Sequence, residues 1–283
     1  MNQSHGIKLR AVPEGRYVEI QGGLRFHLHD VGEARKGTVL FLHGSGPGAS
    51  GYSNFKGNYP YLNEHGYRTL VVDLFGYGYS DKPEDGVYDL GALAGHMRGV
   101  IDALGVEKVS LVGNSMGGAI AIRFALDYPE RVEKLVLMAP GGIEAREVYM
   151  QMEGIKTMIA NLGKPASEES MRETFKLQLF DPSKITDEII EERLQILKLQ
   201  PKGVLGRLKV DDQQDRLSEI EAPVLCLWGM NDKFCPASGA MKIAERCKNS
   251  RTVLVSECGH WVMVEYPQLF NDLCVRFLDG TLG

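Results

Sequence analysis

Short runs of apolar, often β-branched residues recur at long intervals along the chain. The later runs are almost wholly apolar, as strands buried on both faces of a parallel sheet are. The two earliest runs are separated by the pair Gly22 and Gly23, which predicts a β-hairpin. We expect strands at residues 16–21, 24–29, 38–42, 67–73, 108–112, 133–138, 223–228 and 251–256.

Helical periodicity fills much of the sequence between these runs. It is clearest near the C-terminus, where Leu269, Phe270, Leu273, Cys274 and Phe277 form one apolar stripe. We expect helices at residues 54–65, 89–104, 116–127 and 266–278. Strands that alternate with helices predict an α/β protein with a mostly parallel sheet of eight strands.

Residues 142–210 break this alternation. The segment shows no strand pattern, and Pro165, Pro182 and Pro201 divide it into several helical stretches. Because it follows the carboxyl end of a predicted strand, it is well placed to cover a site there. The sequence therefore predicts an α/β core of residues 1–141 and 211–283, with residues 142–210 as a helical lid.

Composition and charge narrow the class of protein. The 283 residues suffice for one large domain, and 43% hydrophobic and 24% charged residues are typical of a soluble globular protein. A net charge of −5 argues against nucleic acid or an anionic membrane as a partner. No apolar run approaches the roughly 18 residues that span a bilayer, and the N-terminus lacks the apolar run of a signal peptide.

The five cysteines indicate the compartment. They are odd in number and scattered, with no CxxC pair, which predicts free thiols in a reducing cytoplasm. The sequence also has no His, Cys and carboxylate cluster with the spacing of metal ligands, so we expect no metal and no cofactor.

The run GNSMG, residues 113–117, has the pattern G-x-S-x-G between a predicted strand and a predicted helix. In so tight a turn the side chain of Ser115 is forced outward from the carboxyl edge of the sheet, and the glycines let the backbone close. This predicts that Ser115 is a nucleophile. The alternative is a glycine-rich turn in which Ser115 only caps the helix.

A serine nucleophile needs a base that is itself oriented by an acid, and on this type of sheet the chain order is Ser, acid, His. Asp232 lies in the loop after the seventh predicted strand, and His260 lies in the loop after the eighth. Each residue has an alternative role. Asp232 would be a surface turn residue, and His260 would be a histidine packed in a loop, which is the commoner role of an isolated histidine. Asp73 is a weaker candidate acid, with structural support as its alternative role. The joint order favours the triad Ser115, Asp232 and His260.

The loop HGSGPGASGYSNF, residues 43–55, follows the third predicted strand. Its glycines let backbone N–H groups approach a ligand, and the helix after Ser115 adds a partial positive charge. We therefore expect an oxyanion hole formed by the N–H groups of Ser45 and Met116. A phosphate-binding loop is excluded, since no Lys-Ser/Thr pair follows.

Arg193 occupies an unexpected place in the helical segment TDEIIEERLQILKLQ. It lies three or four residues from Ile189, Ile190, Ile196 and Leu197, and so on the apolar face. An unpaired arginine there is costly. Either its stem follows the stripe while the guanidinium reaches water or a protein carboxylate, or the lid presents it to the cleft for a substrate carboxylate.

With these motifs in place, nearly the whole chain resembles the meta-cleavage product hydrolases, carbon–carbon bond hydrolases of bacterial aromatic-ring degradation with the α/β-hydrolase fold. The segments that carry the resemblance are HGSGPGASGYSNF, LVGNSMGGAIAIRFALDYPERVEKLVLM, MEGIK, FDPSKITDEIIEER and ECGHWVMVEY. Two features depart from the family. Met230 stands where relatives usually carry arginine, and LVVDLFGYGYSDKP is closer to general α/β hydrolases.

The resemblance implies a substrate and its binding residues. The substrate is a 2-hydroxy-6-oxo-hexa-2,4-dienoate, cleaved between C5 and C6 to 2-hydroxypenta-2,4-dienoate and a carboxylic acid. Relatives are often dimers or larger, so a homo-oligomer is expected, while the C6 substituent stays open. The residues that the resemblance assigns to substrate binding are Arg193, Asn114, Asn54, Gly44, Gly46, Trp261 and Phe180.

Two rival classes share the predicted fold. A general carboxylesterase would have the same triad without needing a buried arginine. A non-catalytic binding protein would be expected to have lost a triad member, and none is missing. Epoxide hydrolases and haloalkane dehalogenases need a carboxylate nucleophile, whereas position 115 is serine.

Overall fold

The computed structural model describes residues 14–161, 167–201 and 203–282, with eight strands in one sheet of order β1-β2-β4-β3-β5-β6-β7-β8. Strand β2 pairs antiparallel with β1 and with β4, and every other neighbouring pair is parallel. The predicted α/β fold with a mostly parallel sheet is therefore confirmed. The strands are Arg16–Glu19 (β1), Arg25–Val31 (β2), Thr38–Leu42 (β3), Arg68–Val72 (β4), Val109–Asn114 (β5), Val132–Met138 (β6), Val224–Gly229 (β7) and Ser250–Val255 (β8).

The first two strands form the predicted hairpin. Gly22 and Gly23 in its turn have φ values of +98° and +82°, which side-chain-bearing residues rarely adopt. The glycine pair thus supplies the backbone conformation that joins β1 to β2.

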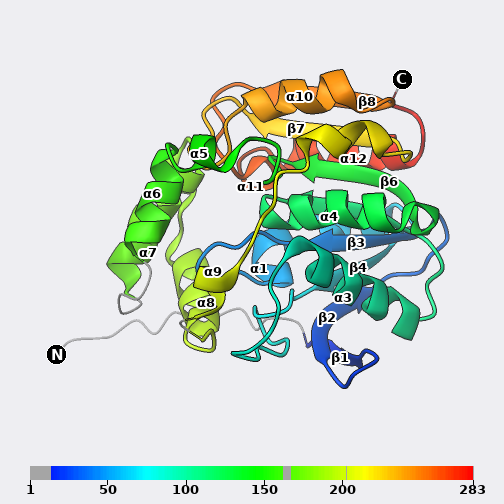
Figure 1. Ribbon diagram of the computed structural model, residues 1–283, viewed down its shortest axis with the longest axis horizontal. Helices are drawn as coiled ribbons and strands as arrows, with labels where there is room; N and C mark the ends of the chain where they lie inside the picture. The colour runs from blue at the N-terminus through cyan, green and yellow to red at the C-terminus, as the bar shows by residue number, and fades with distance from the viewer. Residues whose placement is uncertain (1–13, 162–166, 202, 283) are drawn as a thin grey trace.

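Helices cover both faces of the sheet (Figure 1). Alternate residues of β3 show the division, since Leu40 and Leu42 belong to one apolar cluster and Val39 and Phe41 to the other. The first face carries Leu90–Ala103 (α3), Met116–Asp127 (α4) and Ser238–Arg246 (α10). The second carries Gly51–Phe55 (α1), Tyr59–Glu64 (α2), Val262–Glu265 (α11) and Pro267–Leu278 (α12).

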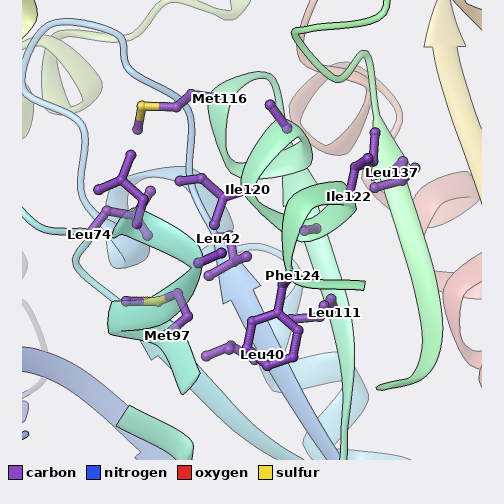
Figure 2. Close-up of a cluster of buried hydrophobic side chains, with 14 of the residues drawn as sticks. Leu40, Leu42, Leu74, Met97, Leu111, Met116, Ile120, Ile122, Phe124 and Leu137 are labelled. Atoms are coloured by element: carbon purple, nitrogen blue, oxygen red, sulfur yellow. The ribbon is translucent and has the colours of Figure 1, made fainter. Parts of the chain in front are cut away.

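Helix α4 is the most deeply buried of these, with nine of its twelve residues buried. Figure 2 shows Ile120 and Phe124 of α4 lying over Leu40, Leu42 and Leu111 of the central strands. Such packing on all sides holds the start of α4 firmly against the carboxyl ends of β3 and β5.

The stretch between β6 and β7 contains the predicted helical segment. In its described part it has no strand, and Figure 1 shows its helices together at one end of the sheet. These are Arg146–Tyr149 (α5), Glu153–Ala160 (α6), Glu168–Gln178 (α7), Asp187–Leu197 (α8) and Val204–Arg207 (α9), with the short 3-10 helix Pro182–Lys184 (η2). We call α5 to α9 the lid. None of the described helices is long and apolar enough to cross a membrane.

Two elements differ from the expectations. The helix predicted at 54–65 is divided into α1 and α2, because Asn58 turns its amide to the carbonyl of Met263 (3.1 Å) and to Asn271 (3.0 Å). Helix α10 was not predicted. Its buried side, with Ala240 and Ile243, is apolar and its opposite side is polar, so a helical pattern was present in the sequence and was overlooked.

Candidate active site

Ser115 lies at the turn between β5 and α4 with φ +56° and ψ −118°, a strained conformation that persists where neighbours enforce it. A Cβ atom on Gly117 would lie 2.0 Å from the carbonyl oxygen of Leu42, and one on Gly113 would lie 2.5 Å from that of Gly117. Both positions therefore require glycine for the helix to approach the strands. The Ser115 N–H donates to the Met138 carbonyl at 2.9 Å, which fixes the turn.

The predicted base and acid form a buried pair. Nδ1 of His260 lies 2.6 Å from Oδ2 of Asp232, and both side chains are almost fully buried. Oδ1 of Asp232 accepts from the N–H groups of Phe234 (2.7 Å) and Cys235 (3.0 Å). These bonds orient the carboxylate, so the Nδ1–H of His260 donates a hydrogen bond to it and Nε2 stays free to take a proton. Ser115 and His260 line the same cavity.

The loop after β3 crosses directly over Ser115. A Cβ atom on Gly44 would lie 3.3 Å from Cβ of Ser115. Ser45 and Met116 both line the cavity beside Ser115. Since Met116 is the first residue of α4, its N–H has no partner within the helix. This placement suits the predicted oxyanion hole, which stays a prediction.

His43 holds this loop in place. Burial lowers the pKa of His43 to about 4, so the ring is neutral near pH 7. Its Nδ1–H donates to the Gly44 carbonyl (2.7 Å), and Nε2 accepts the N–H of Leu74 (3.0 Å). A neutral ring with the proton on Nδ1 is the form that satisfies both bonds.

Asp73 has a structural role, which was the alternative to its being the acid of the triad. Its Oδ1 accepts the Gly51 N–H (2.8 Å), and its Oδ2 accepts the Tyr79 N–H (2.9 Å) and pairs with Nδ1 of His27 (2.9 Å). The carboxylate thereby ties the loop after β4 to the start of α1. It makes no contact with His260.

Arg193 is buried, with 2% of its surface exposed. Its Nη2 donates to Oδ1 of Asn54 at 2.7 Å, and its guanidinium lies over the rings of Trp261 (4.7 Å) and Phe175 (5.3 Å). Its Nε and Nη1 have no partner among the described residues. The side chain therefore does not reach water, which leaves a protein carboxylate as the other partner that the first alternative for Arg193 allowed.

No carboxylate of the described residues forms an ion pair with Arg193. Its neighbour Glu192 pairs instead with Lys56 at 2.7 Å. Burial lowers the pKa of Arg193 to about 10, which leaves the group cationic at neutral pH. A buried cation with two unpaired donors has an unmet requirement for an anion.

Two cavities meet at the nucleophile. The smaller, of about 30 Å³, lies on the Arg193 side, and the larger, of about 970 Å³, lies on the other side. Ser45, Ser115, Ile155 and Met158 line both of them. The lid helix α6 thus places two apolar side chains over Ser115, between the two cavities.

Most of the predicted binding residues come together. Those that line the small cavity with Arg193 are Gly44, Gly46, Asn54, Asn114 and Trp261.

Phe180 is not among the residues that line the small cavity, which corrects the expectation that it binds the substrate. Its side chain is 45% exposed, and it lines neither cavity. Helix α7 ends at Gln178, and the extended backbone at Leu179 alternates the side chains, so Leu179 is buried and Phe180 points outward.

Sequence reasoning missed Gln178, which is 3% exposed and lines the small cavity. The signal that singled out Arg193 was available here too. Gln178 follows Met171 by seven residues and Phe175 by three, so it is a polar residue on the buried face of its helix.

Glu265 is a second missed residue. Its Oε1 accepts the N–H groups of Phe180 (2.8 Å) and Asp181 (3.0 Å), and its Oε2 accepts the Gly259 N–H (2.6 Å). One buried carboxylate thereby joins the lid to the loop that carries His260.

All five cysteines are buried and unpaired, as predicted. Burial and the Asp232 charge raise the pKa of Cys235 well above its ordinary value, while the Ser115 hydroxyl acts in the opposite sense. Cys235 therefore stays a neutral thiol beside the nucleophile. Over the described residues, no group of three or more His, Cys, Asp and Glu side chains is placed to hold a metal ion.

The family model of the α/β-hydrolase fold matches residues 37–267. A 2-hydroxy-6-oxononadienedioate/2-hydroxy-6-oxononatrienedioate hydrolase of Paraburkholderia phymatum is 38% identical over 93% of this chain and 95% of its own. A 2-hydroxy-6-oxo-6-phenylhexa-2,4-dienoate hydrolase of Burkholderia cepacia is 38% identical over 90% of this chain and 91% of its own.

A solved structure agrees with these relatives. The meta-cleavage product hydrolase of Pseudomonas fluorescens IP01 superposes with a TM-score of 0.83 at 30% identity, over 94% of this chain and 98% of that one. The chain belongs to the meta-cleavage product hydrolases. The family resemblance drawn from the motifs is thereby confirmed, and this meta-cleavage product hydrolase is a carbon–carbon bond hydrolase of the α/β-hydrolase fold.

Proposed function

We propose that this hydrolase cleaves the C5–C6 bond of a 2-hydroxy-6-oxo-hexa-2,4-dienoate, with Ser115 as nucleophile, His260 as base and Asp232 as the acid that orients it. The observation that carries the proposal is the buried Arg193 guanidinium, whose Nε and Nη1 have no partner. Each of these N–H groups can donate a charge-assisted hydrogen bond to a carboxylate. The names of the relatives, which are dienoate hydrolases, support the same substrate class.

The two cavities orient the substrate. The carboxylate lies at Arg193 in the small cavity, the C6 carbonyl lies at Ser115, and the C6 substituent enters the large cavity. A volume of about 30 Å³ holds little more than one water molecule. Binding of the dienoate therefore displaces the side chains of Ile155 and Met158, which line both cavities.

The first chemical step is a proton shift. The proton of the 2-hydroxyl group is lost and a proton is added at C5, which turns the dienol into a 2,6-dioxo-hex-3-enoate. Negative charge develops toward C1 and C2 during this step. Arg193, held by Asn54 at 2.7 Å, stabilises that charge in a site closed to water.

Cleavage follows at the nucleophile. Ser115 adds to C6 while His260 takes its proton, and the N–H groups of Ser45 and Met116 bind the oxyanion. The C5–C6 bond then breaks, and its electron pair is delocalised through C4 and C3 to the oxygen on C2. Protonation gives 2-hydroxypenta-2,4-dienoate, and water activated by His260 releases the carboxylic acid from Ser115.

The test compares two substrate classes in Arg193→Ala. We expect kcat/KM on the 6-phenyl dienoate to fall by ~10² or more, because a charge-assisted contact to a carboxylate is lost. Neutral nitrophenyl esters should react almost as before. Arg193→Lys should restore only part of the loss, since a point charge does not reproduce the bidentate fork.

Arg172→Ala is the matched control, because Arg172 lies on the outer side of the lid and pairs with Glu168 and Asp187. It should leave the ratio of the two activities unchanged. Equal losses on both substrates in Arg193→Ala, with a lowered melting temperature, would make Arg193 a structural residue and refute the proposal.

We further infer a cytoplasmic homo-oligomer. The five unpaired thiols support the reducing compartment, and the resemblance to oligomeric relatives supports the assembly. Light scattering coupled to size-exclusion chromatography tests the assembly, and a mass of about 31 kDa would contradict it.

A further inference from the structure

The small cavity holds unpaired acceptors as well as unpaired donors. Besides Nε and Nη1 of Arg193, two buried atoms of the side chains that line this cavity have no partner among the described residues: Oδ1 of Asn114 and Oε1 of Gln178. All three side chains are buried and line the cavity. A substrate carboxylate only accepts hydrogen bonds, so it can pair with the arginine but leaves both carbonyl oxygens unpaired. The complete set of polar atoms therefore calls for a ligand that also carries a donor.

Gln178 lies at the arginine end of this cavity. A Cβ atom on Gly46 would be 3.8 Å from Nε2 of Gln178 and 3.9 Å from Nη1 of Arg193. The amide and the guanidinium thus approach the same point. A ligand that places its carboxylate on Arg193 brings the neighbouring atom of its skeleton within reach of Gln178.

Asn114 lies at the other end, near the nucleophile. Its Oδ1 is 3.2 Å from the position of a Cβ on Gly44, and Cβ of Ser115 is 3.3 Å from the same position. Its Nδ2 donates to the carbonyl oxygens of Met138 (3.3 Å) and His260 (3.5 Å), so its amide is held in one orientation. The amide of Gln178 has no such anchor in the described residues and is free to turn.

We propose that Gln178 hydrogen-bonds the oxygen on C2 of the dienoate, and that it selects substrates with oxygen at that carbon. The proposal rests on the proposed function. Oε1 accepts a hydrogen bond from the 2-hydroxyl group, and after the proton shift to C5 a turn of the amide lets Nε2 donate a hydrogen bond to the 2-oxo group. An amide serves both states, whereas a carboxylate only accepts and an ammonium group only donates.

The backbone of Gln178 has a separate task, since its carbonyl accepts the His260 N–H at 2.7 Å. Side-chain substitutions leave that bond in place. Gln178→Met keeps the length of the side chain and removes both polar atoms, so it isolates the contact to the substrate.

The experiment measures binding without turnover, in the Ser115→Ala background. The probes are 2-hydroxy-6-oxo-6-phenylhexa-2,4-dienoate and its analogue without the 2-hydroxyl group, 6-oxo-6-phenylhexa-2,4-dienoate. With Gln178 present we expect the 2-hydroxy compound to bind about tenfold more tightly. Gln178→Met should bring the two dissociation constants close together and leave that of the analogue nearly unchanged. Gln178→Asn, which draws the amide back by one methylene, should also lower the preference.

Gln213→Met is the matched control. Gln213 is equally buried, its Nε2 donates to the Ala119 carbonyl at 3.1 Å, its Oε1 has no partner among the described residues, and it lines neither cavity. This variant should keep the tenfold preference.

The outcomes separate the two proposals. A preference that survives both substitutions of Gln178, or that is absent while Gln178 is present, overturns the role of Gln178 and leaves the dienoate site standing. Failure of both probes, and of the corresponding 6-methyl pair, to bind the Ser115→Ala protein overturns the proposed function itself, and the role of Gln178 with it.

Discussion

A Cβ atom on Gly48 would lie 2.0 Å from the carbonyl oxygen of Arg193, so the backbone of lid helix α8 rests directly on the loop after β3. Gly48 also has φ +62°, a conformation that disfavours any side chain. The same loop carries Ser45 and Gly46. This contact therefore sets the distance between the guanidinium and the loop that covers the nucleophile.

Gly48→Ala is expected to push α8 away and misplace Arg193. We expect kcat/KM on the dienoate to fall by roughly tenfold or more, because small displacements of a positioning group are costly in catalysis. The loss on nitrophenyl esters should be smaller. Gly57→Ala is the control, since a Cβ there would meet nothing within 4 Å. An unchanged ratio of the two activities would show that the contact does not position Arg193.

Ser115→Ala and His260→Ala should each lower kcat on the dienoate by ~10³ or more, since nucleophile and base act as a unit. For the same reason the double variant should be no slower than either single variant. Steady-state rates and melting temperatures check this, and the melting temperatures should stay close to that of the parent protein. Near-parental hydrolysis by Ser115→Ala would refute the triad.

The pH dependence of stability should report on His43. Its pKa is about 4 in the folded protein and 6.5 in the unfolded chain, so protonation favours unfolding. The stabilisation is complete above pH 6.5 and is lost as the pH falls through 4, with a total near 3 kcal/mol.

His43→Asn keeps a donor for the Gly44 carbonyl and removes the titrating ring. It should be less stable than the parent at pH 7 and lose less of its free energy of unfolding between pH 6.5 and 4. Urea unfolding across this range gives both slopes, and parallel curves would contradict the assignment.

Glu265→Gln should destabilise the fold by about 1–3 kcal/mol, because an amide nitrogen replaces one oxygen and leaves backbone donors without an acceptor. The rate on both substrate classes should fall together, since the loop of His260 loosens. Glu257→Gln, an exposed substitution in the same loop, is the control and should change neither property. A loss confined to the dienoate would show that Glu265 acts on the substrate side alone.

The elements that the sequence predicted well are those whose pattern is dominated by burial. Helix α4 begins and ends at the expected residues because it is apolar almost throughout, and the elbow glycines mark the position of Ser115. The break at Asn58 was not predictable locally, because its cause is a pair of hydrogen bonds to residues more than 200 positions away.

In the lid, the family motif led to a wrong expectation for Phe180. The position of Phe180 depends on where α7 ends, and a shift of two residues exchanges an exposed ring for a buried amide at Gln178. The role of Glu265 was equally hidden, since its three partners are backbone N–H groups that have no signature in the sequence.

The bond from the His260 N–H to the Gln178 carbonyl has a wider consequence, because it joins the predicted base to the lid. Glu265 binds both segments as well, so a displacement of the lid at this side would also pull on the loop that carries His260.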